Sequence, residues 1–235
     1  SRMIGPGAWQ QVPRFHRLSS MTTRTAMLRN IRSLLFLSVL LGSLSAGAQV
    51  LDPPVVNCGS VNVSGDVTLT WTAPADPNGD FAGYEVWHSS VAGGPFTLLT
   101  TIPAIGTLTY FHAGAGADIG PQFYCIITLS TGPPPNESIP SDTLATIHLQ
   151  VFQSTPLGNA SLQWAAPAIA PNAAAQFTIW QEYPIGTWTQ IGTVPTTTFN
   201  YQHVISVCED SLTFRVGLAD ASGCVSYSSR DGEVF

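Results

Sequence analysis

The stretch that decides the fold is "GDVTLTWTAPADPNGDFAGYEVW", residues 65–87. It contains two runs in which apolar and polar residues alternate, and the segment between them, from Pro74, is rich in Pro, Asp, Asn and Gly. Alternation with a period of two is typical of a strand with one buried face, and Pro ends a strand because it lacks a backbone N–H donor. We therefore expect a strand–turn–strand unit, with Val67, Leu69 and Trp71 on one face of the first strand.

The same plan recurs near the end of the chain. There "NASLQWAAP" (159–167) is followed by "QFTIW" (176–180), and Trp164 precedes Phe177 by 13 residues, the spacing found in the first copy. The offset between the copies stays at 90 to 93 residues. About 90 residues with seven or so short strands is the size of one immunoglobulin-like sandwich. The sequence thus predicts an all-β chain of two tandem immunoglobulin-like β-sandwiches, with Trp71 and Trp164 in separate cores.

The first 48 residues form a separate, cationic segment. Six of the eight arginines lie within the first 32 residues, which contain no acidic residue. From Met27 a short basic region leads into an apolar run at 34–46, and small residues follow it up to Ala48. These three parts together indicate a secretory signal peptide. We expect upstream, non-native sequence at 1–20 and a signal peptide at 21–48.

The mature chain that remains is acidic. Residues 49–235 hold fourteen acidic residues against Arg215 and Arg230, a formal charge of −12. Nucleic acids and anionic membranes are bound through clustered Lys and Arg, so we expect neither as a partner. The apolar run at 34–46 is too short to cross a bilayer and is lost with the signal peptide, so the mature chain should contain no membrane span. The export signal indicates a secreted or cell-surface protein.

Several motifs give the chain a resemblance to a known family. A Trp on the second strand, Tyr-x-Val on the third, Tyr-x-Ile-x-Thr (124–128) on the sixth and a Gly-led return into Ser-x-x-Ser (226–229) resemble fibronectin type III domains. More narrowly, "VNCGSVNVSGDVTLTW" and "ISVCEDSLTFRVGLADASGCVSYSS" are similar to tandem modules of secreted, gliding-motility-associated surface proteins of Bacteroidetes. The resemblance implies a longer protein with a sorting domain beyond Phe235.

The expected domain boundary follows from the placement of the strands. Residues 141–154 would supply the last strand of a first fibronectin type III-like domain, 50–148, and the first strand of a second, 149–235. The linker is then almost absent, which predicts restricted hinge motion between the domains.

The mature chain offers little that supports catalysis. Its histidines, at 88, 112, 148 and 203, are scattered, and no Gly-x-Ser-x-Gly, His-x-x-x-His or Cys-x-x-Cys motif occurs. Asp76, Asn78 and Asp80 match three positions of a calcium-binding loop, but Phe81 and Trp87 replace its Gly and its final Glu, so a turn is favoured. We expect no enzyme, no cofactor and no metal site.

These observations favour a non-catalytic module at the cell surface. In this hypothesis the sandwiches act as a structural spacer, for adhesion or for display within a larger secreted protein of the gliding-motility-associated type, and the partner is a protein or glycan at the cell surface. The alternative is an accessory or carbohydrate-binding region of an extracellular hydrolase whose catalytic domain lies elsewhere. The fold alone does not separate the two, because sandwiches serve many functions.

Strand alternation also predicts where a partner would touch. If the core residues of the third and sixth strands point inward, Trp87, Phe123 and Ile127 point outward as an apolar strip. In the second domain Trp180 would lie beside Arg215, as a cation–π pair. The competing expectation is that a loop or the adjacent domain covers these side chains, because large exposed apolar patches are uncommon in soluble monomers.

Four cysteines in an exported chain suggest disulfides, with three possible connectivities. Nearness in sequence and the family resemblance favour Cys208 with Cys224. If the sixth strand separates them, however, they lie about 25 Å apart at about 3.3 Å per residue, whereas bridged Cα atoms lie within about 7 Å. Cys125 alternates with Tyr124, so a core Tyr124 would turn Cys125 outward, and Cys58 would have to reach around the sheet to meet it. The connectivity stays open.

The resemblance also implies modification sites. Asp142-Thr143-Leu144 and Asp210-Ser211-Leu212 match the Asp-Ser/Thr-apolar pattern that the resembled proteins use for O-glycosylation. We therefore expect O-glycans on Thr143 and Ser211.

Overall fold

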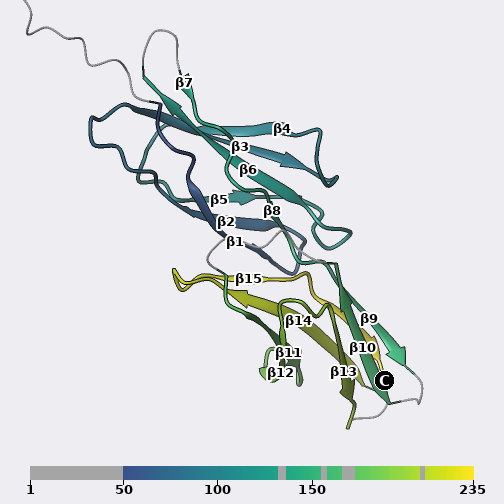
Figure 1. Cartoon of the computed structure of the whole chain (residues 1–235). Helices are drawn as coiled ribbons and strands as arrows, with labels where there is room; N and C mark the ends of the chain where they lie inside the picture. Colours follow the sequence, from purple (N-terminus) through teal and green to yellow (C-terminus); the bar gives the residue numbers. More distant parts are fainter. Residues whose placement is uncertain (1–49, 132–135, 155–157, 166–172, 207–209) are drawn as a thin grey trace, which may run out of the picture. The chain divides into compact units, whose positions relative to one another are not determined.

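All the secondary-structure elements that the computed structural model describes are strands, joined by turns and loops (Figure 1). That part comprises residues 50–131, 136–154, 158–165, 173–206 and 210–235. The expected upstream sequence (1–20) and signal peptide (21–48) lie outside it. Within the described ranges, the chain contains no helix with the length and apolar character that a membrane span requires. The predicted all-β fold is confirmed.

The first sandwich consists of two antiparallel sheets. One sheet has the strand order β1–β2–β5, and the other has the order β4–β3–β6–β7 with β8 also paired to β6. The strands are β1 (Val55–Val61), β2 (Val67–Thr72), β3 (Phe81–Ser89), β4 (Thr97–Ile102), β5 (Thr109–His112), β6 (Phe123–Ser130), β7 (Asn136–Glu137) and β8 (Leu144–Ala145). Burial alternates along β2, so Val67, Leu69 and Trp71 share the buried face, as predicted.

The second sandwich repeats this arrangement. One sheet has the order β13–β10–β9, and the other has the order β12–β11–β14–β15 with β16 paired to β14. The strands are β9 (Leu149–Ser154), β10 (Asn159–Trp164), β11 (Gln176–Glu182), β12 (Trp188–Pro195), β13 (Asn200–Val204), β14 (Ser211–Ala219), β15 (Val225–Tyr227) and β16 (Asp231–Val234). The two tandem immunoglobulin-like sandwiches expected from the repeat are therefore present.

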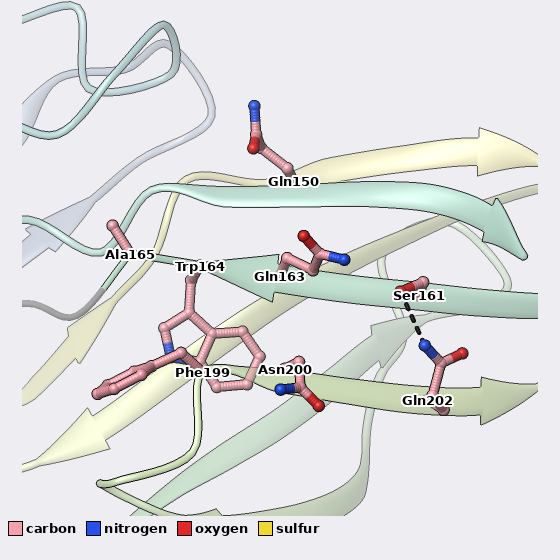
Figure 2. A pocket seen from close by; sticks show the side chains of 8 residues that line it. All are labelled: Gln150, Ser161, Gln163, Trp164, Ala165, Phe199, Asn200 and Gln202. Carbon is pink, nitrogen blue, oxygen red and sulfur yellow. Dashed lines mark hydrogen bonds between the residues drawn. The ribbon is translucent and has the colours of Figure 1, made fainter.

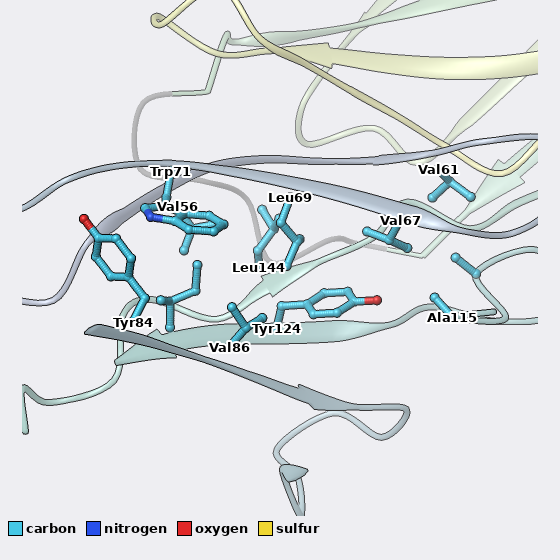
Figure 3. Close-up of a cluster of buried hydrophobic side chains, with 12 residues drawn as sticks. Val56, Val61, Val67, Leu69, Trp71, Tyr84, Val86, Ala115, Tyr124 and Leu144 are labelled. Carbon is cyan, nitrogen blue, oxygen red and sulfur yellow. The ribbon is translucent and has the colours of Figure 1, made fainter. Parts of the chain in front are cut away.

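An edge-on pair of aromatic rings lies in the core of the first sandwich (Figure 3). Trp71 of β2 meets Tyr84 of β3 with ring centroids 5.5 Å apart and ring planes at 74°. This pair joins the two sheets, and Tyr124 of β6 is fully buried in the same cluster. Because burial raises the pKa of Tyr124, its hydroxyl stays protonated over the physiological range.

The second sandwich has a core of its own, built around the equivalent pair. Trp164 of β10 meets Phe177 of β11, again with centroids 5.5 Å apart, at 78°. Phe214 of β14 is fully buried in this second cluster, which shares no residue with the first. The expectation of separate cores, with Trp71 and Trp164 buried and ring residues in equivalent places, is confirmed.

A disulfide joins Cys58 of β1 to Cys224, which lies in the turn between β14 and β15, with the Cα atoms 6.3 Å apart. It is thus a bond between the two sandwiches. The expected Cys208–Cys224 pairing is not the one in the structure, and Cys208 itself lies outside the described residues. Cys125 is a free, buried cysteine. Nearness in sequence gave the wrong pairing because the bridged residues are 166 positions apart and meet only when both sandwiches are folded.

Polar contacts surround the disulfide. The Thr70 hydroxyl on β2 lies 3.0 Å from Sγ of Cys58 and 3.1 Å from Sγ of Cys224. The backbone N–H of Gly59 donates to Oγ of Ser226, at 3.2 Å. This small patch connects β1 and β2 of the first sandwich to the β14–β15 hairpin of the second.

The connection between β8 and β9 is only three residues long, 146–148, and its backbone is hydrogen-bonded on both sides. The N–H of Thr146 donates to the carbonyl of Gln122, in the first sandwich. The carbonyl of Ile147 accepts from the N–H of Ser229, in the second. These bonds agree with the expectation of a very short linker, while the exact boundary at 148 and 149 stays a prediction.

We predict that Trp71→Ala and Trp164→Ala each lower the free energy of unfolding by about 3–5 kcal/mol, because each removes a buried ring that joins two sheets. Guanidinium unfolding followed by far-UV circular dichroism would measure the change. Trp87→Ala, which truncates a half-buried indole, serves as the control and should have a smaller effect. Equal losses in all three variants would contradict the two-core arrangement.

We also predict that the Cys58–Cys224 bridge raises the free energy of unfolding by about 2–5 kcal/mol, since it closes a long loop in the unfolded chain. Peptide mapping without reductant should recover the Cys58–Cys224 pair. Cys58→Ser should lower the unfolding midpoint, and Cys208→Ser should leave it unchanged. A lower midpoint for Cys208→Ser and an unchanged one for Cys58→Ser would instead support the Cys208–Cys224 pairing.

Candidate functional site

The expected contact surface of the first sandwich lies on the outward face of β3, β4 and β6. We call Trp87, Leu98, Phe123 and Ile127 the outer strip. Trp87 pairs across the strands with Leu98 on β4 and with Cys125 on β6. Leu98 is 44% exposed, and the other three members are half-buried. The strip is therefore partly accessible. The competing expectation, that the chain covers Trp87, Phe123 and Ile127 completely, is not observed.

The indole of Trp87 is held in place by its own strand. Its Nε1–H donates to Oε2 of Glu85, two residues earlier on the same face of β3, at 3.1 Å. Cys125, the cross-strand neighbour of Trp87, faces outward by alternation yet is only 6% exposed. Burial raises the pKa of the Cys125 thiol. Cys125 is therefore a packed, unreactive member of this face, and Leu98 is a member that strand alternation alone did not single out.

The corresponding face of the second sandwich carries a stack of rings around Arg215. Trp180 and Arg215 are cross-strand partners on β11 and β14, as predicted, and the guanidinium carbon lies 5.7 Å from the Trp180 ring. Two rings that sequence reasoning missed are closer, Trp188 of β12 at 4.1 Å and Tyr227 of β15 at 4.0 Å. Arg230 adds a second guanidinium 5.1 Å from the Trp188 ring. Each of these distances allows cation–π attraction.

The stack leaves little of Arg215 for a partner. Burial lowers the pKa of the Arg215 guanidinium, the nearby Tyr227 opposes that shift, and the side chain is half-buried. Its Nε is buried and has no hydrogen-bond partner among the described residues. Trp180 is likewise oriented by a bond from Nε1 to Oγ1 of Thr178, at 3.0 Å. Arg215 therefore acts first as a cross-strand tie between four strands, whereas the outer strip has no such internal cation.

A third surface feature lies on the other sheet of the second sandwich (Figure 2). A hollow of about 520 Å³ is lined by residues of β9, β10 and β13 and of the segments next to them. The amide side chains that line it are Gln150, Gln163, Asn200 and Gln202, and Figure 2 shows Gln202 bonded to Ser161. The sequence pattern did not single out this surface, although Asn200 and Gln202 occupy alternate positions of β13.

The calcium-loop positions form a hydrogen-bonded turn. The Asp76 carboxylate accepts from the backbone N–H of Asp80, at 2.8 Å, and from that of Phe81, at 3.1 Å. Both carboxylate oxygens of Asp76 thus cap the backbone at the start of β3, which supports the turn interpretation. In the described part of the chain, no three His, Cys, Asp or Glu side chains come close enough together to hold a metal ion.

The two predicted glycosylation sites differ in accessibility. Ser211 is exposed at the start of β14, and its N–H donates to Oδ1 of Asp210. Thr143, just before β8, is half-buried. O-glycosylation of either residue stays a prediction.

The structure also reveals a repeated Tyr-x-His motif that sequence analysis treated as scattered histidines. On β5, His112 stacks on Tyr110, and on β13, His203 stacks on Tyr201, with ring centroids 6.4 Å apart in both. Burial lowers the pKa of both histidines, and the charge of His88 lowers that of His112 further. In each sandwich the imidazole is therefore favoured in its neutral form.

We predict that both sandwiches lose stability as the pH falls from 7 to 5. A histidine whose folded pKa is depressed binds fewer protons than its unfolded counterpart, with its pKa of about 6.5, so protonation favours unfolding in this window. The unfolding midpoint at pH 5 and pH 7 would measure the effect. The double variant His112→Gln/His203→Gln should show a flatter dependence, and an unchanged slope would contradict this origin.

No protein-family model matches this chain, and no curated protein matches it. Among solved structures it is similar to a two-domain fibronectin type III segment of chicken tenascin, at 14% identity and a TM-score of 0.29, covering 80% of this chain and 99% of that one. The FN1–FN3 domains of chicken contactin (CNTN1) match at 14% identity and a TM-score of 0.31, covering 76% and 67%. At these scores the assignment of two sandwiches rests on strand order and on the two cores.

Proposed function

We propose that the chain is a non-catalytic module of a larger secreted protein, of the gliding-motility-associated type found in Bacteroidetes. In this proposal the two sandwiches, at 50–148 and 149–235, form a rigid spacer that displays a contact surface outside the cell. The module functions in adhesion or display, and its partner is a protein or glycan at the cell surface.

The Cys58–Cys224 bridge supports an extracellular location. Disulfides persist in secreted and surface proteins, whereas cytosolic thiols are kept reduced. A bond between two modules also supports a spacer, because it limits the motion of one module against the other. The N-terminal segment with the features of a signal peptide points to the same compartment.

The single observation that carries the proposed adhesive role is the outer strip. Its aromatic and aliphatic side chains lie on three hydrogen-bonded strands, and the bond to Glu85 orients the central indole, that of Trp87. Ordered aromatic anchors are the usual centres of binding energy, because they bury much area and lose little conformational freedom. In the second sandwich the equivalent face is tied together by Arg215, so we place the contact on the first.

One observation favours the alternative, a carbohydrate-binding region of an extracellular hydrolase. The amide-lined hollow on β9, β10 and β13 has the side-chain chemistry that recognises sugar hydroxyls. Sequencing the gene beyond Phe235 distinguishes the two hypotheses. Further sandwiches and a sorting domain would support the surface module, and a catalytic domain would support the hydrolase.

The adhesive role can be tested with beads coated with the full chain and mixed with cells of the organism that produces it. We expect Trp87→Ala to weaken attachment about five- to thirty-fold, the effect of losing about 1–2 kcal/mol at an anchor residue. Phe123→Ser should act in the same direction. Val63→Ser removes a 70% exposed apolar side chain outside the strip and is the matched control.

Circular dichroism would show that the variants remain folded. Attachment that is equal for Trp87→Ala, Phe123→Ser and the parent chain would contradict contact through the outer strip. Attachment that falls equally in Val63→Ser would indicate nonspecific apolar adsorption instead.

A further inference from the structure

We infer that the outward face of β9, β10 and β13 is a binding site for an uncharged polysaccharide. We call Gln150, Phe152, Ser161, Gln163, Asn200 and Gln202 the amide platform. All six point away from the core of the second sandwich, and five of them line the hollow shown in Figure 2. This inference does not depend on the outer strip, which lies on the other sandwich, so the two can fail separately.

Strand register arranges these side chains in two rows. In the first row Gln163 of β10 lies between Gln150 of β9 and Asn200 of β13. In the next row Ser161 lies between Phe152 and Gln202. Neighbouring strands are about 4.8 Å apart and residues on one face of a strand are about 6.6 Å apart. The amides therefore form a regular array, which suits an extended ligand with repeated hydroxyl groups.

The two rows differ in how their hydrogen-bonding groups are used. Gln202 is fixed, because its Nε2 donates to Oγ of Ser161 at 2.8 Å and its Oε1 accepts from Oγ of Ser154 at 3.2 Å. The amides of Gln150, Gln163 and Asn200 make no hydrogen bond to any described residue. Each of these amides can both donate and accept, as a sugar hydroxyl does. The first row thus presents amides with unused donors and acceptors, and in the row beside it Gln202 is already held in one orientation.

The absence of charge on this face selects the class of ligand. No Asp, Glu, Lys or Arg occupies an outward position of these three strands. The mature chain has a formal charge of −12, so an anionic polymer would be repelled and would find no cation here. A neutral polysaccharide needs no cationic side chain for binding, and the negative charge of the protein does not weaken its binding.

Phe152 provides the apolar part of the contact. It is 46% exposed and lies next to Ser161 on the platform. The ring can cover a C–H face of a sugar, while its amide neighbours bind the hydroxyls at the edge. Binding sites combine apolar surface with a few directed polar groups in this way.

The equivalent place on the first sandwich is occupied. There Cys58 and Thr70 hold the cross-strand positions that Gln150 and Gln163 hold in the second, one step from the core Trp in each β-strand pair. Cys58 and Thr70 contact Cys224 of the second sandwich. The first sandwich therefore uses this face for a contact within the chain, whereas the second presents amides and a hollow at the same place.

The test uses affinity electrophoresis of the full chain in gels that contain hydroxyethyl cellulose, dextran, mannan or xylan. Carboxymethyl cellulose, the anionic counterpart of the first, is included as the charge control. We expect retardation by at least one neutral polymer and none by carboxymethyl cellulose. Gln150→Ala/Gln163→Ala should weaken binding about tenfold, the effect of losing two hydrogen bonds.

Two further variants separate the platform from its surroundings. Phe152→Ala should also weaken binding, and Gln153→Ala, which removes an exposed amide from the opposite side of the same strand, should leave it unchanged. Circular dichroism and the unfolding midpoint confirm that each variant is folded. These residues lie outside the Cys58–Cys224 contact and outside the outer strip.

Three outcomes would overturn the inference. The first is no retardation by any of the four neutral polymers. The second is retardation that persists unchanged in the Gln150→Ala/Gln163→Ala variant. The third is self-association of the parent chain that the same double variant abolishes, which would show that the platform is an interface between copies of this protein.

Discussion

The edge-on contact between a Trp on the second strand and a ring on the third is the interaction on which the rest of the structure depends. Trp71 with Tyr84, and Trp164 with Phe177, each join the two sheets of a sandwich at the same centroid distance. Each pair sets which faces of its strands are buried, and strand alternation then sets every outward position. The outer strip and the amide platform are therefore consequences of how the Trp residues are placed, because each occupies the face opposite a core.

The second sandwich contains few cationic side chains, and those it has are stacked on aromatic rings. Arg215 and Arg230, the only two arginines in residues 49–235, both lie over the ring of Trp188. A guanidinium is more weakly hydrated than an ammonium and stacks on aromatic faces, so it can be partly buried between rings at modest cost. The cations are thereby used within the fold, and the remaining surface is acidic or neutral. Such a surface favours neutral partners over polyanions.

The architecture could be predicted from the sequence because its signals are local. Alternation, Pro at the strand ends and a 13-residue spacing specify each unit without knowledge of the other. The Cys58–Cys224 bridge could not be predicted, since it depends on how one copy meets the next. Trp188 and Tyr227 were missed as neighbours of Arg215 because their contact requires the register of four strands. The amide platform was missed because glutamine and asparagine on a strand have no motif.

The bridge between the sandwiches has a mechanical consequence. Cys58 lies near the start of the first sandwich and Cys224 near the end of the second, 166 positions later. The disulfide therefore closes the chain between them into a covalent ring. Tension applied between the two ends of residues 50–235 would run along the short segment before Cys58, cross the sulfur–sulfur bond, and leave along the segment after Cys224. Both Trp-centred ring pairs lie between the two cysteines, on the branch of that ring that carries no tension. While the bond is intact, a pull could peel away the part of β1 before Cys58, and β15 and β16, but could not extend the chain between the two cysteines.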